Sequence, residues 1–199
     1  MLVFWEERLV FLATPKTGTT AIEMALRPVA GIAITDPPVV KHTPIYRFRR
    51  FLAPYLAACG AEDFETVAAV RHPVDWLGSW YRYRSRPELE GHPNSTRGIS
   101  FDAFVRGYLK KRRPPFADVG SQAKFLADAE GRVAVDHLFR YEAQPALLAF
   151  LEKRLGREIK LKRLNESPPA ELSLRPRLRQ RLEAELPAEF AVWKAARQE

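Results

Sequence analysis

A short polar segment, residues 14–20 (TPKTGTT), lies between an apolar run and a helical pattern and has residue types that bind phosphate. Backbone N–H groups in a strand-to-helix loop, together with the N-terminus of the following helix, can surround an anion. Lys16 would add a mobile positive charge, and the hydroxyl groups of Thr19 and Thr20 would donate to phosphate oxygens. The alternative is an ordinary turn with a helix-capping threonine. The segment is not a Walker A loop, because Lys16 precedes Gly18, whereas the Walker A lysine follows the second glycine.

A second set of polar residues begins at Arg71, directly after another apolar run. Pro73 favours a helix start, and in that helix Asp75, Ser79 and Arg82 would share one face. Arg71 and Ser79 could then bind a second phosphate from the end of a neighbouring strand. Taken singly, Arg71 fits a salt-bridged surface arginine and Ser79 an ordinary helix serine. The aromatic residues of the other helix face fit the hydrophobic core: Trp76, Trp80 and Tyr83.

The elements that must position these residues alternate between strands and helices. Apolar runs predict strands at residues 9–13, 39–41, 66–70 and 133–139. Residues 2–5 form either another short strand before a turn or an irregular lead into the strand at 9–13. Helical spacing predicts helices at residues 19–26, 47–59, 76–83, 101–109, 144–155 and 175–196, the last with a break at Pro187. The run 9–13 shows no polar alternation, which is typical of a strand covered on both faces. We therefore expect an α/β sandwich with a central, mostly parallel sheet flanked by helices.

Length and composition are those of one globular domain. The chain has 199 residues, of which 46% are hydrophobic and 28% charged, so we expect a single domain over residues 1–199. The formal net charge of +8 favours an anionic partner. The single cysteine, Cys59, cannot close an internal disulfide, and its small apolar neighbours predict a buried thiol. A cytoplasmic location is expected, because this cysteine usage fits a reducing compartment and the first residues, with Glu6 and Glu7, are unlike a signal peptide.

Taken together, the two polar segments resemble the nucleotide signatures of sulfotransferases that use 3′-phosphoadenosine 5′-phosphosulfate (PAPS). The first is PKTGTT at residues 15–20, and the second is RHPVDWLGSWY at residues 71–81. Three later segments are similar to landmarks of bacterial members of this family: residues 140–142 (RYE), 164–167 (LNES) and 186–193 (LPAEFAVW). The late Arg-Lys-Gly loop of the animal cytosolic enzymes is absent, and Lys162 and Arg163 are only a weak substitute for it.

The resemblance implies a P-loop-like three-layer sandwich that binds PAPS and releases 3′,5′-adenosine bisphosphate (PAP). The first segment would hold the 5′-phosphosulfate and the second the 3′-phosphate. The cofactor-binding residues so implied are Lys16, Thr17, Gly18, Thr19 and Thr20 for the former, and Arg71 and Ser79 for the latter. In-line sulfuryl transfer builds negative charge on the bridging oxygen, which Lys16 would stabilise as a catalytic residue. This chemistry requires no metal, and no cluster with metal-ligand spacing stands out in the sequence.

The acceptor hydroxyl also needs a general base, and His42 is the first candidate. It follows the expected strand 39–41, as Lys16 and Arg71 follow theirs, so three polar groups would meet at the carboxyl edge of one parallel sheet. The rival is Glu23, four residues after Thr19 on the helix that leaves the loop. The acceptor is not identified by these residues, and a carbohydrate and a lipid both stay open.

Two other classes of function stay open at this point. A nucleotide kinase or other phosphoryl transferase of similar fold would require a complete Walker A loop, which is missing. A non-catalytic module that binds RNA or another polyanion would use the basic stretch 71–113, which has ten Lys or Arg against four acidic residues. The same excess would attract an anionic polysaccharide, and nucleic acid is not the expected partner.

Overall fold

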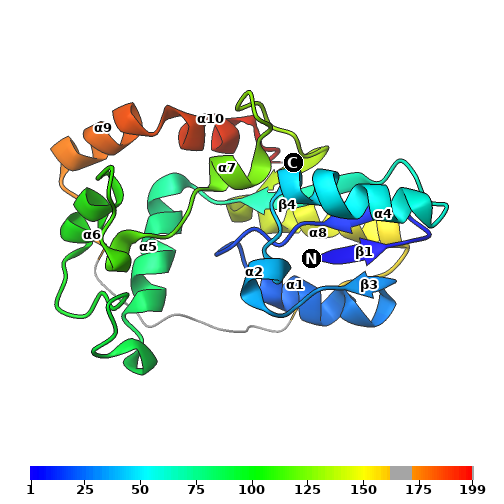
Figure 1. Cartoon of the computed structure of the whole chain (residues 1–199), viewed down its shortest axis with the longest axis horizontal. Coiled ribbons are helices and arrows are strands. Elements are labelled where there is room, and N and C mark those ends of the chain that lie inside the picture. Colours follow the sequence, from blue (N-terminus) through cyan, green and yellow to red (C-terminus); the bar gives the residue numbers. More distant parts are fainter. Residues whose placement is uncertain (162–171, 199) are drawn as a thin grey trace.

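The computed structural model describes residues 1–161 and 172–198. In this part of the chain, one sheet holds the strands in the order β3-β1-β2-β4-β5 (Figure 1). The strands are β1 (Leu2–Phe4), β2 (Leu9–Phe11), β3 (Ile32–Ala33), β4 (Glu65–Val70) and β5 (His137–Arg140). The strands expected near residues 9–13 and 66–70 are thereby confirmed, residues 2–5 form the first of their two alternatives, a short strand, and the last expected strand begins later than predicted.

The sheet is mixed, so the expectation of a mostly parallel sheet is wrong. Strand β1 pairs antiparallel with both β2 and β3, whereas β2, β4 and β5 pair in parallel. The physical reason is local, because β1 and β2 are joined by a tight turn and a hairpin must reverse the chain. In this turn Arg8 donates from Nη1 to the carbonyl oxygen of Trp5 at 2.7 Å.

Helices cover both faces of this sheet, because alternate strand residues point to opposite sides. Leu2, Phe4, Leu9 and Phe11 pack with α1 (Thr19–Leu26) and α8 (Gln144–Leu155). Val3, Val10 and Leu12 pack on the other face. The helical elements there are α3 (Ile45–Arg47), the π-helical turn η2 (Phe48–Leu52), α4 (Ala53–Ala58), α7 (Gln122–Leu126) and α10 (Pro187–Ala195). An α/β fold with helices flanking a central sheet is thus confirmed.

A third hydrophobic cluster lies beside the sheet, at the left of Figure 1, and consists mainly of helical residues. It is built from α5 (Pro73–Arg84), α6 (Phe101–Tyr108) and α9 (Pro176–Glu185). Helix α5 begins three residues after β4 ends, and it connects the sheet to this cluster. The break expected at Pro187 is confirmed, because that residue opens α10.

Two local predictions are wrong. Residues 39–41 lie in a short helix, α2 (Pro38–Lys41), instead of a strand. Pro38 takes the first helical position, which suits its fixed φ, and the place beside β1 is already occupied by β3, so the two valines have no strand to pair with. The thiol of Cys59 is exposed because residue 59 follows the last turn of α4 at the surface.

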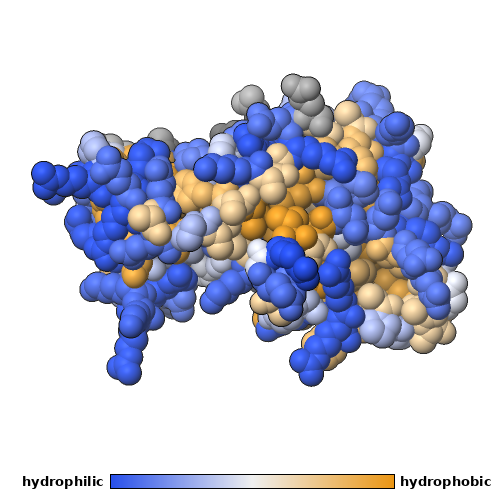
Figure 2. Space-filling view, turned by 90° about the horizontal axis from the view of Figure 1, so that it is seen from above, coloured by the Kyte–Doolittle hydropathy of each residue, from blue (hydrophilic) through white to orange (hydrophobic). Residues whose placement is uncertain are grey.

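The surface is mostly hydrophilic on the side that Figure 2 shows, with apolar residues gathered near the middle of that face. Within residues 1–161 and 172–198, no helix has the length and apolar character needed to cross a bilayer.

Candidate functional site

The loop between β2 and α1 has a tightly curled backbone. Lys16 and Gly18 have φ angles of 66° and 71°, a region that glycine enters freely and lysine rarely. The Thr17 hydroxyl donates to the carbonyl oxygen of Thr14 at 2.9 Å, and Nε1 of Trp76 donates to that of Pro15 at 2.9 Å. Contacts within the loop and from α5 therefore hold Lys16 in a strained conformation, which is a common feature of functional loops.

The ammonium group of Lys16 lies against aromatic rings. Its Nζ is 4.0 Å from the ring centroid of Tyr83 and 5.2 Å from that of Trp80, both on α5. Burial, followed by the charges of neighbouring arginines, lowers the pKa of Lys16 to about 7. A bound anion would counter both effects and restore the full positive charge.

The arginines that act on Lys16 are Arg86, Arg71 and Arg82, and together the four residues form a cationic cluster. Burial and the charge of Arg71 also lower the pKa of Arg82. Among the residues that the structure describes, no member of this cluster is ion-paired with a carboxylate. Close, unpaired like charges repel, so the cationic cluster is suited to an anion carrying more than one charge.

Arg71 is held by its backbone and leaves its side chain available. Its N–H donates to Oε1 of Gln122 at 2.9 Å, and its carbonyl oxygen accepts from Nε2 of Gln122 at 2.8 Å. The guanidinium lies 4.5 Å from the ring centroid of Tyr141, and its Nε is buried with no acceptor in the described part of the chain. A buried donor without a partner is costly, and a ligand oxygen would satisfy it.

Tyr141 links the two polar segments. Besides stacking on Arg71, its ring lies against Gly18, where an added Cβ would come within 3.2 Å of Cε2. The glycine is therefore required both by its backbone angle and by the closeness of this ring. Neighbouring Glu142 accepts from the backbone N–H of His72 at 2.7 Å and from Nε1 of Trp193 at 3.1 Å.

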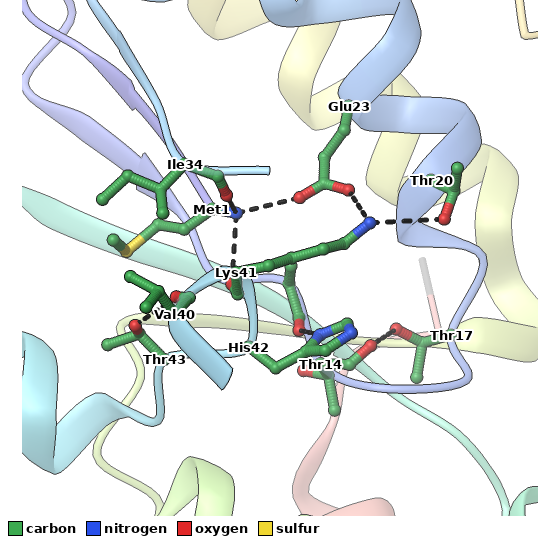
Figure 3. A network of polar contacts seen from close by, with 11 residues as sticks. Met1, Thr14, Thr17, Thr20, Glu23, Ile34, Val40, Lys41, His42 and Thr43 are labelled. Carbon is green, nitrogen blue, oxygen red and sulfur yellow. Dashed lines mark hydrogen bonds and ion pairs between the residues drawn. The ribbon is translucent and has the colours of Figure 1, made fainter. Parts of the chain in front are cut away.

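His42 lies at the start of the same loop, although it follows a helix and not the expected strand (Figure 3). Its Nδ1 is 2.6 Å from the carbonyl oxygen of Ala13. Because a carbonyl can only accept, Nδ1 carries the proton, and in the neutral ring Nε2 has a free lone pair. Burial lowers the pKa of His42 below its usual value, so the ring is neutral at pH 7.

The carboxylate of Glu23 forms ion pairs with two cations, as Figure 3 shows. Its oxygens lie 2.8 Å from the amino group of Met1 and 2.6 Å from Nζ of Lys41, and its side chain is 3% exposed. Lys41 Nζ also donates to the hydroxyl of Thr20 at 3.4 Å. Glu23 thereby fixes Lys41, and with it His42, beside the loop.

The structure brings most of the residues predicted for the site into one region. The positive charge of Arg71 lowers the pKa of Lys16. His42 contacts Ala13 just before the loop, and Lys41 contacts Thr20 at its end. Ser79 is buried on α5, where it is 7% exposed. The hydroxyl of Thr17 is used inside the loop, so only the backbone of Thr17 stays available for a ligand.

Four residues of this region were given no ligand-binding role by the sequence: Arg82, Arg86, Gln122 and Tyr141. The helical spacing had placed Arg82 on the face of Ser79, and Tyr141 lies in the 140–142 landmark, whereas no sequence signal indicated Arg86 or Gln122. Trp76 lies in the core and Trp80 packs against it, as predicted, whereas Tyr83 is 37% exposed. Trp80 and Tyr83 also border the Lys16 ammonium. Residues 162–167, which hold Lys162, Arg163 and the LNES segment, lie outside the described part of the structure.

Comparisons of the chain with protein-family models, with curated proteins and with solved structures give no match. Within residues 1–161 and 172–198, no group of three or more His, Cys, Asp or Glu side chains is arranged to hold a metal ion. The site is therefore defined by its own geometry: a strand-to-helix loop, a cationic cluster that forms no ion pair with a described carboxylate, and a neutral imidazole.

Proposed function

We propose that this chain is a sulfotransferase that transfers the sulfuryl group of PAPS to the hydroxyl of an acceptor. The observation that carries the proposal is the cationic cluster of Lys16, Arg71, Arg82 and Arg86, none of which forms an ion pair with a carboxylate among the described residues. Asp75 is the acidic residue that acts on Arg82 from a greater distance. A nucleotide with two separated phosphates fits it, because Lys16 belongs to the loop before α1 and Arg71 follows the adjacent strand β4. The β2–α1 unit would then act in a P-loop-like manner, and the proposed setting is the reducing cytoplasm.

The residues divide into binding and catalytic roles. Loop 16–20 and the N-terminus of α1 would bind the 5′-phosphosulfate, whereas Arg71 and Ser79 would bind the 3′-phosphate. The free Nε2 of His42 takes the proton of the acceptor hydroxyl while the new S–O bond forms and the bond between sulfur and the bridging oxygen breaks. The leaving phosphate oxygen gains the electron pair of that bond, and Lys16 stabilises it as an ammonium.

The test compares two nucleotides that differ by one phosphate. PAP should stabilise the protein by about 2.7 kcal/mol at roughly 100 times its dissociation constant, and AMP at the same concentration should stabilise it less. In Arg71→Ala the two nucleotides should give nearly equal shifts in Tm. The Gln122 contacts are to the backbone of residue 71, so this variant keeps them.

Arg97→Ala is the matched control, because Arg97 is ion-paired with Glu90 outside the cationic cluster. It should keep the difference between PAP and AMP. Equal shifts for both nucleotides in the wild type would contradict the proposal. Steeply salt-dependent RNA binding without any response to PAP would instead favour a polyanion-binding module, and a preference for ATP with Mg²⁺ would favour a phosphoryl transferase.

A further inference from the structure

One continuous helical stretch, residues 45–58, runs through α3, η2 and α4 and carries an unusual outer face. Its inner face packs on the sheet through Ile45, Phe48, Leu52 and Leu56, at spacings of three, four and four residues. Packing of the inner face stabilises this helix, so folding does not require any particular residue type on the outer face.

The outer face exposes three large aromatic side chains. Tyr46 is 50% exposed, Phe51 64% and Tyr55 61%. Phe51 and Tyr55 are separated by four residues, one turn apart on the helix. These three side chains are exposed, so packing in the core does not explain their size and apolar character. Their exposure on one helical element indicates an interaction surface.

Arginines are interleaved with these aromatic residues. The guanidinium carbon of Arg47 lies 5.8 Å from the ring centroid of Tyr46, and that of Arg50 lies 5.3 Å from the centroid of Phe51. Residues 37–61 contain Lys41 and three arginines but no Asp or Glu. The face is therefore basic as well as aromatic, and it lacks the acidic residues that balance an ordinary solvated helix.

A hollow of about 310 Å³ opens beside this helix. Arg49 and Arg50 line it together with Tyr46, Ile45 and three alanines, Ala127, Ala129 and Ala134. Asp128 also lines it, and its carboxylate is ion-paired with Arg132 at 3.0 Å. Arg49 also donates to the carbonyl oxygen of Ala134 at 2.6 Å, which ties the helix to the opposite wall. Apolar side chains next to guanidinium groups suit an amphipathic ligand that has an anionic head and an apolar body.

We propose that the outer face of helix 45–58 docks on an anionic lipid surface. Tyr46, Phe51 and Tyr55 enter the boundary between headgroups and acyl chains, while Arg47 and Arg50 bind lipid phosphates. This lipid surface matches both features of the face, because it offers negative charge and an apolar layer together. The docking does not depend on the sulfotransferase activity, although helix 45–58 begins three residues after His42 and would hold that residue near the headgroups.

Vesicle flotation of the full chain tests the docking. We expect binding to vesicles with about a third of phosphatidylserine and little binding to phosphatidylcholine alone, and the binding should weaken as salt is raised. The variant Arg47→Ala/Arg50→Ala should bind about 25-fold more weakly, at about fivefold per arginine. Its control is Arg177→Ala/Arg179→Ala on α9, which lowers the net charge equally and should bind nearly as well as the wild type.

Insertion of the aromatic residues has its own readout. Cys59, the single cysteine, is exposed at the end of α4 and can carry an environment-sensitive fluorophore. Its emission should rise and shift to shorter wavelength with anionic vesicles, and Phe51→Ala/Tyr55→Ala should abolish this change. Met24→Ala, at a 57% exposed residue of α1, is the control and should keep it.

Three outcomes would overturn the docking. They are equal binding by Arg47→Ala/Arg50→Ala and its α9 control, unchanged fluorophore emission on bound protein, and binding of RNA through this face without binding of vesicles. PAP binding is measured separately, so failure of the docking and failure of the sulfotransferase proposal are distinguishable.

Discussion

Nδ1 of His42 and the carbonyl oxygen of Ala13 are joined by a hydrogen bond of 2.6 Å, and this contact decides which nitrogen of the ring can act as a base. Ala13 is the residue before the phosphate loop, so the contact also places the imidazole at the loop's start. The ring is oriented by a backbone carbonyl, and no carboxylate of residues 1–161 or 172–198 forms a hydrogen bond with it. A base held in this way is neutral at pH 7 because burial lowers its pKa more than the hydrogen bond to Ala13 raises it, and the same bond fixes its tautomer.

The variant His42→Ala should lower kcat by about 10² to 10⁴, since a general base contributes on that scale. PAP affinity should be nearly unchanged, because His42 is assigned to the acceptor. In the wild type, kcat/KM should fall as pH drops through the pKa of His42, below 6.5, and the variant should lose this acidic limb. Wild-type turnover in His42→Ala would remove His42 from the mechanism.

The variant Glu23→Gln should affect stability more than turnover. It removes the charge that pairs with Lys41 and the Met1 amino group, and loss of one partner of a buried ion pair costs about 3 kcal/mol or more. Urea unfolding would measure the loss, with the exposed Glu6→Gln as control. If Glu23→Gln is as stable as the control yet inactive, while His42→Ala is active, the base is Glu23.

Replacement of Lys16 and of Arg71 should have different kinetic effects. Lys16→Ala should lower kcat strongly even at saturating PAPS, because the ammonium stabilises charge that develops only in the transition state. Arg71→Ala should act mainly through the KM for PAPS, because the 3′-phosphate is unchanged by the reaction. The two assignments are reversed if saturating PAPS rescues Lys16→Ala but not Arg71→Ala.

Binding of PAP should take up protons above neutral pH. The pKa of Lys16 is about 7 in the free protein, so the group is mostly neutral at pH 8, and a bound anion raises that pKa again. Affinity should therefore fall as pH rises from 7. Calorimetry at pH 8 in buffers of different ionisation enthalpy should show uptake of about 0.9 proton, and Lys16→Met should show none. Uptake that persists in Lys16→Met would assign the proton to another group.

Gly18→Ala should lower both stability and PAP affinity. The φ of 71° costs an alanine about 1 to 2 kcal/mol, and the new Cβ would press on Tyr141 and disturb its stacking on Arg71. Gly156→Ala separates the two effects, because Gly156 has a φ of 61° and nothing within 4 Å of an added Cβ. The control should lose stability only. Equal PAP affinity in both variants would show that the Tyr141 contact does not support the site.

Local patterns in the sequence were sufficient for the parts of the fold that depend on near neighbours. The buried strand at 9–11, the loop after it and α1 follow from an apolar run, a polar segment and helical spacing in direct succession. Pro73 and Pro187 predict the starts of α5 and α10 because a proline's fixed φ acts on its own residue. The phosphate-loop hypothesis arises from residues adjacent in the chain, and the same holds for the selection of Arg71 as a second anchor.

Only the tertiary structure decided the features that depend on distant partners. Val39 and Val40 lie in α2 instead of a strand because β3 occupies the edge beside β1. No local sequence pattern shows which segment will pair with that edge. Arg82 and Arg86 became part of the site, and Lys16 acquired a pKa of about 7, because folding brought these cations together and removed water from them. The outer face of helix 45–58 likewise depends on tertiary packing, because Ile45, Phe48 and Leu56 pack on the sheet and leave the opposite side of the helix exposed. The charge state and the burial of a side chain depend on the residues around it in the folded protein. They are therefore decided only when residues far apart in the chain come into contact.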